Sequence, residues 1–154
     1  MQNYINPIEL LNLDTDILSG VDSSTIRKAK KTLLAEIELS DTDTVIHNGI
    51  ELTKSDCLRV IDDLDNKDKK DFHLFIYQNT DLNIFLTTGD LTFFKTYKTE
   101  SIYKLPEFID FISPYFSVQY AMGLSRNFKT NDFNNVKAIL SIKPIVNESH
   151  FEDL

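Results

Sequence analysis

The sequence of 154 residues predicts a mainly α-helical fold, a compact bundle of about seven short helices with one small β-hairpin near residues 45–52. Three observations support this prediction. Apolar residues recur at the 3.6-residue helical period in several separate segments. Most of these segments begin at a residue that can cap a helix. Gly and Pro number only four each, which disfavours a turn-rich β-sandwich or barrel.

The clearest helix covers residues 22–39. Asp22 can cap its first turn, because the carboxylate accepts hydrogen bonds from backbone amides that lack a helical partner. Lys30 falls inside the apolar stripe, so its aliphatic stem should lie along the core while its ammonium reaches solvent. The stripe predicts a packed helix, and its positions follow the helical period: Ile26, Ala29, Leu33, Leu34 and Ile37.

Shorter elements flank this helix. Asn6 and Pro7 suit the cap and the first position of a helix that reaches Leu13. Asn48-Gly49 separates two short runs of alternating apolar and polar residues, and predicts a hairpin with a type I′ turn. Thr53 is then expected to cap the next helix.

The second half of the chain is also predicted to be helical. A helix is expected over residues 71–78, and a capped start at Thr80-Asp81 should lead to a helix stop at Gly89. Asp90 is expected to cap a short helix. Ser113-Pro114 should break or kink the aromatic segment 106–124, and a new helix could start there. A last helix should begin at Thr130 or Asn131 and end at Pro144.

The chain is predicted to form a single helical domain over residues 1–154, which is an ordinary domain length. The weakest seam lies near residues 98–104. No internal repeat or low-complexity tract divides the sequence.

The net charge of −8 opposes nucleic-acid binding, because phosphate contacts require a basic surface. Basic residues gather in RKAKK (27–31) and KDKK (67–70). Such clusters are usually solvated helix faces. The functional alternative is a docking patch for an acidic partner, with Arg27, Lys28 and Lys31 as candidate residues.

Reactive side chains are scarce. His47 and Cys57 could meet in space as a nucleophilic pair, but Cys57 more often packs as a small apolar residue. His73 and His150 have no metal-ligand spacing to another His or Cys. The acidic runs DTD (14–16 and 41–43) and DDLDN (62–66) suggest calcium, but they lack the EF-hand pattern and are better explained as loops and caps. No catalytic, cofactor-binding or metal-binding residue is assigned, and no cofactor is expected.

No signal peptide and no membrane span is evident, so a cytoplasmic protein with no membrane partner is expected. The single Cys57 cannot form an internal disulfide. Three of the 16 basic residues are Arg, which leaves 13 Lys, a bias that suggests an AT-rich bacterial genome.

Residues 6–39 resemble the start of a J-domain. The resemblance rests on Asn6-Pro7-Ile8-Glu9-Leu10-Leu11-Asn12-Leu13 and on the basic helix after it, Ser24-Thr25-Ile26-Arg27-Lys28-Ala29-Lys30-Lys31. It implies a J-like helical hairpin. The family's His-Pro-Asp tripeptide, which stimulates a chaperone ATPase, does not occur, and residues 37–41 read IELSD at its place. No functional residue is carried over.

These observations predict a non-enzymatic protein–protein interaction or regulatory module, with a protein partner and an unknown oligomeric state. The alternative is a small ligand-binding domain or enzyme with an aromatic-lined pocket among residues 108–120. Phe residues at helical spacing are more often core than pocket.

Overall fold

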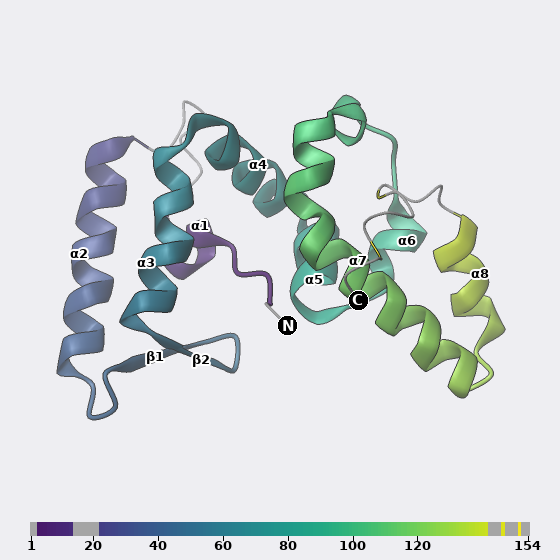
Figure 1. The fold of residues 1–154 in the computed structure, drawn as a ribbon, viewed down its shortest axis with the longest axis horizontal. Coiled ribbons are helices and arrows are strands. Elements are labelled where there is room, and N and C mark those ends of the chain that lie inside the picture. Colours follow the sequence, from purple (N-terminus) through teal and green to yellow (C-terminus); the bar gives the residue numbers. More distant parts are fainter. Residues whose placement is uncertain (1–2, 14–21, 142–145, 147–150, 152–154) are drawn as a thin grey trace. The chain divides into compact units, whose positions relative to one another are not determined.

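The computed structural model describes residues 3–13, 22–141, 146 and 151 (Figure 1). Within these residues the chain forms eight α-helices and a two-stranded antiparallel sheet, so the prediction of a mainly α-helical fold with one hairpin is confirmed. Contacts between Cα atoms group the chain into two compact units. The amino-terminal unit is residues 5–77, and the carboxy-terminal unit is residues 78–154 together with the start of the chain as far as Tyr4. The division falls near the end of α4, whereas residues 98–104 lie inside the carboxy-terminal unit.

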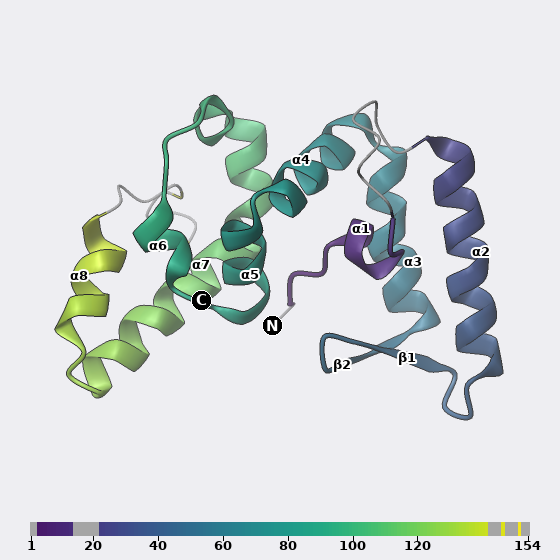
Figure 2. The ribbon, with the colours of Figure 1, turned by 180° about the vertical axis from the view of Figure 1, so that it is seen from behind.

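The amino-terminal unit contains most of the elements that carry the candidate site. They are α1 (Pro7–Leu10), α2 (Ser23–Leu39), β1 (Thr44–His47), β2 (Ile50–Thr53), α3 (Lys54–Asp62), the 3₁₀ turn η1 (Asp63–Asp65) and α4 (Lys67–Gln78). Helices α2 and α3 lie side by side, and the hairpin lies at one end of the pair (Figures 1 and 2).

The predicted helix starts in this unit are confirmed by their hydrogen bonds. The amide of Ile8 donates to Asn6 Oδ1 over 3.0 Å, and the amide of Thr25 donates to Asp22 Oδ1 over 2.7 Å. Thr53 and Asp56 form a reciprocal capping box at the start of α3. Side-chain oxygens thus satisfy amide groups that have no helical partner.

The hairpin has the predicted turn. Asn48 and Gly49 adopt φ values of 49° and 78°, the positive values that a type I′ turn requires at both positions. Val45 faces Leu52 across the strands and Ile46 faces Glu51. Leu52 is buried and Ile46 is exposed, so one face of the hairpin packs on the helices and the other meets solvent.

One hydrophobic core holds the amino-terminal unit together, and it includes the apolar stripe of α2. Its buried members come from α1 and its following turn, α2, β2, α3 and η1: Ile8, Leu10, Leu11, Leu13, Ile26, Leu33, Ile37, Leu52, Cys57, Ile61 and Leu64.

The carboxy-terminal unit contains α5 (Thr80–Thr88), α6 (Thr92–Thr96), the 3₁₀ turn η2 (Ser101–Lys104), α7 (Pro106–Lys129) and α8 (Phe133–Ser141). Gly89 ends α5 in the left-handed conformation with φ 77°, as predicted. The predicted cap at Thr80-Asp81 is wrong by one residue. Asn79 Oδ1 accepts from the amide of Leu82 over 3.2 Å, and a short Asn side chain is a better cap than Thr.

The expected new helix at Ser113-Pro114 does not occur, because α7 runs through both residues. Proline removes only its own amide donor, and the Ser113 hydroxyl donates to the Ile109 carbonyl over 2.5 Å. The α7 ribbon changes direction along its length (Figure 1), so the alternative of a kinked helix is the one that the structure adopts.

The last helix starts later than predicted. Asp132, rather than Thr130 or Asn131, accepts from an amide of its first turn, that of Asn135, over 3.2 Å. Helix α8 ends at Ser141. The predicted stop at Pro144 lies outside the described residues.

Aromatic side chains dominate the core of the carboxy-terminal unit. The Phe85 ring lies 4.9 Å from that of Phe94 and 5.1 Å from that of Phe116, measured between ring centroids, and both pairs meet edge to face. Such pairs add stability beyond their buried area. Phe85 and Phe116 are fully buried, and so is Phe108.

Candidate functional site

The three predicted docking residues, Arg27, Lys28 and Lys31, are all exposed on α2, but they do not share one surface. Successive residues of a helix point about 100° apart, since 3.6 residues complete a turn. Lys28 and Lys31 lie on the side of α2 that faces away from the core. Arg27 borders a pocket between α2 and the elements that follow the hairpin.

The side of α2 turned away from the core combines positive charge with apolar area. We call it the outer face of α2, and its residues are Lys28, Lys31, Thr32, Ala35, Glu36 and Leu39. Leu39 is 86% exposed, the largest exposure among the large hydrophobic side chains of the described residues. By helical geometry Lys31 and Glu36 lie at opposite edges, with Ala35 and Leu39 between them. Lys28 lies in the same central stripe as Ala35 and Leu39, but two to three turns nearer the amino end of α2. The outer face therefore offers cations toward its amino end and apolar side chains toward its carboxyl end.

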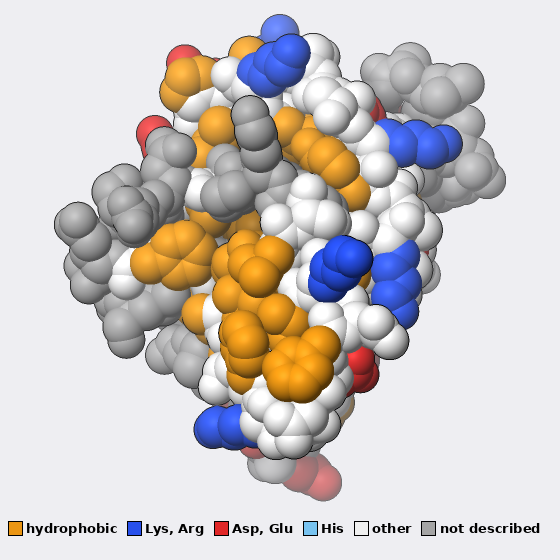
Figure 3. All heavy atoms as spheres, turned by 90° about the vertical axis from the view of Figure 1, so that its right-hand side faces the viewer, with side chains coloured by type: hydrophobic (Ala, Val, Ile, Leu, Met, Phe, Trp, Pro, Cys, Tyr) orange, Lys and Arg blue, Asp and Glu red, His pale blue; other side chains and the backbone are white. Residues whose placement is uncertain are grey.

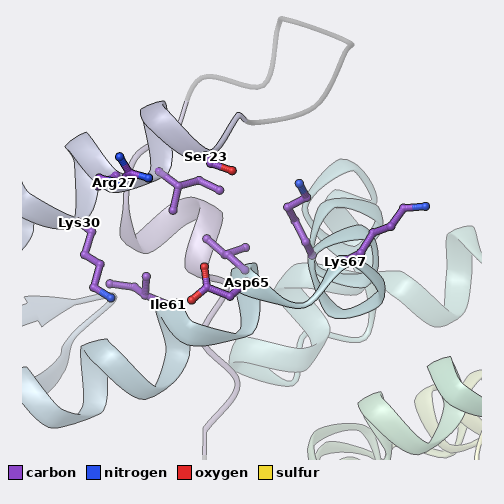
Figure 4. Close-up of a pocket in the computed structure, with 9 residues that line it drawn as sticks. Ser23, Arg27, Lys30, Ile61, Asp65 and Lys67 are labelled. Carbon is purple, nitrogen blue, oxygen red and sulfur yellow. The ribbon is translucent and has the colours of Figure 1, made fainter.

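A pocket of about 320 Å³ lies on the other side of Arg27. Three apolar side chains line it, Ile26 from α2, Ile61 from α3 and Leu64 from η1. Figure 4 shows Lys30 descending from α2 toward Ile61, with Asp65 facing the same space. We call this the basic pocket, because its charged lining is mostly cationic.

The basic pocket brings together the two basic clusters of the sequence. Arg27 and Lys30 belong to the first cluster, and Lys67 and Lys70 at the start of α4 belong to the second. Asp65 is the one carboxylate among the described lining residues. The sequence shows both basic clusters but does not show that they line one pocket. The placement of Lys30 inside the apolar stripe was the one sign that part of the first cluster turns toward the core.

The cations of the basic pocket differ in their partners. Lys30 is half-buried, and its Nζ lies 3.5 Å from Asp62 Oδ1, so its stem follows the core as predicted. Arg27, Lys67 and Lys70 form no ion pair with any described residue. Three cations in one concave site raise the local positive potential of a chain whose net charge is −8.

A buried histidine fixes the turn that carries one wall of the basic pocket. His73 Nε2 lies 3.1 Å from Asp63 Oδ2, and Lys69 Nζ lies 2.9 Å from Asp63 Oδ1. Burial lowers the pKa of His73 against the opposing effect of Asp63. Burial alone would raise the pKa of Asp63, but hydrogen bonds from His73 and Lys69 outweigh it and lower that pKa. A neutral His73 thus donates to an ionised Asp63, and we call the three side chains the Asp63 clasp.

The predicted His47–Cys57 pair is not assembled. His47 Nε2 lies 4.0 Å from Glu9 Oε2 and 3.3 Å from Asn48 Nδ2, and no hydrogen bond in the described structure joins His47 to Cys57. Burial raises the pKa of the Cys57 thiol, which opposes formation of the thiolate that a nucleophile needs. Cys57 lies in the hydrophobic core.

The acidic run 62–66 acts through ion pairs and turns, since Asp62 and Asp63 pair with Lys30 and Lys69. Within the described ranges no three His, Cys, Asp or Glu side chains gather as a metal site. The acidic run 14–16 and His150 lie outside those ranges.

The aromatic segment 108–120 contributes Phe108 and Phe116 to the core. Further along α7 and α8, large apolar side chains are exposed by 42–60%: Met122, Phe128, Phe133 and Leu140. Figure 3, viewed from the side of α8, shows hydrophobic side chains gathered on this part of the surface.

None of the described helices combines the length and the apolar character needed to cross a membrane. Comparisons of the chain with protein-family models, with curated proteins and with solved structures found no match.

Proposed function

We propose that this chain is a non-enzymatic protein–protein interaction module, and that the outer face of α2 docks an acidic segment of a partner protein. One observation carries this assignment. Leu39 is 86% exposed beside Ala35, on the same helix face as the cations Lys28 and Lys31.

The chemistry of the outer face defines the partner segment. Covering a Leu side chain that is almost fully exposed removes apolar area from water, which stabilises a complex by about 1.5–3 kcal/mol. Lys28 and Lys31 form no ion pair with a described residue, so their charges are available to carboxylates. Charged edges mainly steer association and select the partner. Lys31 and Lys28 lie about two and three helical turns from Leu39, so a helix with an apolar anchor and Asp or Glu two to three turns away fits this face.

The test uses affinity capture from a lysate of the source organism, followed by binding of the purified candidate partner. Lys28→Glu with Lys31→Glu reverses the charges of the two cations, and Leu39→Ser removes the exposed apolar side chain. Each variant should weaken binding of the purified partner by about tenfold or more, which corresponds to about 1.4 kcal/mol. The affected partner should contain an acidic amphipathic segment.

A matched control reverses two exposed lysines in the other unit, Lys129→Glu with Lys137→Glu. The control has the same change in net charge, so it separates a local contact from long-range attraction. Equal binding by the wild type and by the Lys28/Lys31 variant would contradict the assignment. So would an equal loss in the control variant.

We also propose that the protein is cytoplasmic, as expected from the sequence. The buried free thiol of Cys57 supports this location, because such a thiol needs no oxidising compartment. The J-domain resemblance of residues 6–39 stays a prediction. We expect no stimulation of a chaperone ATPase, because the His-Pro-Asp tripeptide is missing.

A small-ligand-binding role is the second candidate function. The basic pocket favours it, rather than the aromatic segment 108–120, whose Phe108 and Phe116 are buried in the core.

A further inference from the structure

We infer that the basic pocket binds a small phosphorylated molecule with an apolar part. This site is separate from the outer face of α2, and its function does not depend on a protein partner. The pocket of about 320 Å³ lies near the lower end of the size range of small-molecule sites, about 300–1,000 Å³. A ligand with one ring and one phosphate suits this volume.

The charge of the pocket selects an anion. Arg27 belongs to α2, whereas Lys67 and Lys70 belong to the start of α4, and all three line the pocket. None of these three cations forms an ion pair with a described residue, so an anion would not have to displace a described carboxylate from them. Arg presents a planar fork to a phosphate, and Lys adds point charges.

The positions of the helices add to this preference. Ser23 is the first residue of α2 and Lys67 the first residue of α4, so the amino ends of two helices border the pocket. The amino end of a helix carries a partial positive charge. The Asp22 carboxylate that caps α2 offsets this charge, whereas the neutral side chain of Asn66 caps α4, so α4 makes the contribution. Asp65 offers an acceptor, and a hydroxyl of the ligand could donate to it.

The inner wall of the pocket selects the rest of the ligand. Ile26, Ile61 and Leu64 belong to the hydrophobic core, and their edges line the pocket between the cations. A purely inorganic anion would leave these edges covered by water. A phosphate joined to a small apolar body uses both kinds of lining, and this distinguishes the site from a solvated group of lysines.

The probe is phenyl phosphate, titrated into the full chain while backbone amide signals are followed by NMR. We expect saturable shifts at Ile26, Ile61 and Leu64. Inorganic phosphate should bind at least about fivefold more weakly, because it lacks the ring. Phenol should give no saturable shift at these residues, because it lacks the charge. Raising the salt from about 0.1 M to about 1 M should weaken binding, since the Debye length falls from about 10 Å to about 3 Å.

Two variants and a matched control locate the binding. Arg27→Gln and Lys70→Gln should each weaken phenyl phosphate at least about fivefold, because each removes one charged hydrogen-bond donor. Lys31→Gln removes the same charge from the outer face of α2 and should leave the affinity unchanged. An unchanged unfolding midpoint in all three variants shows that each remains folded.

Absence of saturable shifts at the three apolar residues overturns the inference. Equal weakening of phenyl phosphate binding by Lys31→Gln and Lys70→Gln also overturns the inference, because the affinity would then depend on net charge alone. Neither result bears on partner docking at Lys28 and Lys31, so the two assignments fail separately.

Discussion

The Asp63 clasp offers the sharpest test of how the turn beside the basic pocket is held. Asp63→Ala removes the acceptor of the hydrogen bond from His73 Nε2, which is 3.1 Å long, and the ion pair with Lys69. His73 is 3% exposed, so solvent cannot readily replace the lost acceptor. A buried donor left without its acceptor costs about 1–3 kcal/mol. The half-exposed Lys69 pair adds about 0.2–1 kcal/mol.

The free energy of unfolding should therefore fall by about 1–4 kcal/mol in Asp63→Ala. Asp63→Asn retains an oxygen that can accept from His73 and loses only the charge, so we expect a loss of about 1 kcal/mol. Lys69→Met breaks the solvent-accessible pair alone and should cost at most about 1 kcal/mol. The order of the three losses tests the clasp more strictly than any single value.

The assay is urea unfolding of the full chain, followed by circular dichroism. Amide signals of Ile61 and Leu74 should be followed in parallel by NMR, because a chain with two compact units need not unfold in one step. If Asp63→Ala lost no more stability than Lys69→Met, His73 would not depend on Asp63, and the description of the clasp would be refuted.

Two further predictions concern the protonation of His73 and the aromatic core. The His73 pKa is lowered from its ordinary 6.5 in the folded state, so the unfolded state binds the proton more readily and the free energy of unfolding should fall as the pH drops below about 6.5. In the His73→Gln variant the free energy of unfolding should fall less steeply between about pH 7 and pH 5 than in the wild type. Some pH dependence should remain because of His47, whose pKa is also lowered by burial. An equal pH dependence of the free energy of unfolding in the two proteins would contradict this prediction. Phe116→Ala should lower the free energy of unfolding by about 3–5 kcal/mol, because it opens a cavity beside Phe85. Phe128 is 51% exposed, so Phe128→Ala should lower the free energy of unfolding by less than about 1 kcal/mol in the same urea experiment. Similar losses in these two variants would show that Phe116 is not part of a packed core.

Local chemistry made much of the fold predictable. Asn48-Gly49 determines its turn because both residues tolerate positive φ, and that requirement involves no distant part of the chain. Asn6, Asp22 and Thr53 determine helix starts for a similar reason, since each bonds an amide within three residues of itself.

The errors arose where neighbouring groups compete. Helix α7 continues through Pro114, because proline removes only one backbone donor and the helix bends to accommodate it. Thr80 and Asp132 show that adjacent polar residues compete for the cap, and sequence alone does not decide between them at a resolution of one residue.

The basic pocket could not be predicted because it depends on tertiary packing. Arg27 and Lys70 are far apart in sequence, and they line one space only because α2 packs on α3 and η1 leads the chain into α4. Periodicity placed Lys30 in the apolar stripe, but it carries no information about which helix will face that stripe.

The geometry of α2 separates two binding functions that a linear cluster would combine. In RKAKK, Arg27 and Lys30 border the basic pocket, while Lys28 and Lys31 belong to the outer face. Neighbouring residues of one helix point in different directions, so a ligand in the pocket need not contact a partner on the outer face. Reversal of Lys28 and Lys31 should then weaken partner docking about tenfold or more without loss of phenyl phosphate binding. Lys70→Gln should weaken phenyl phosphate binding without loss of partner docking. If every charge change affected both activities equally, the net charge of the unit, and not the two surfaces of α2, would govern recognition.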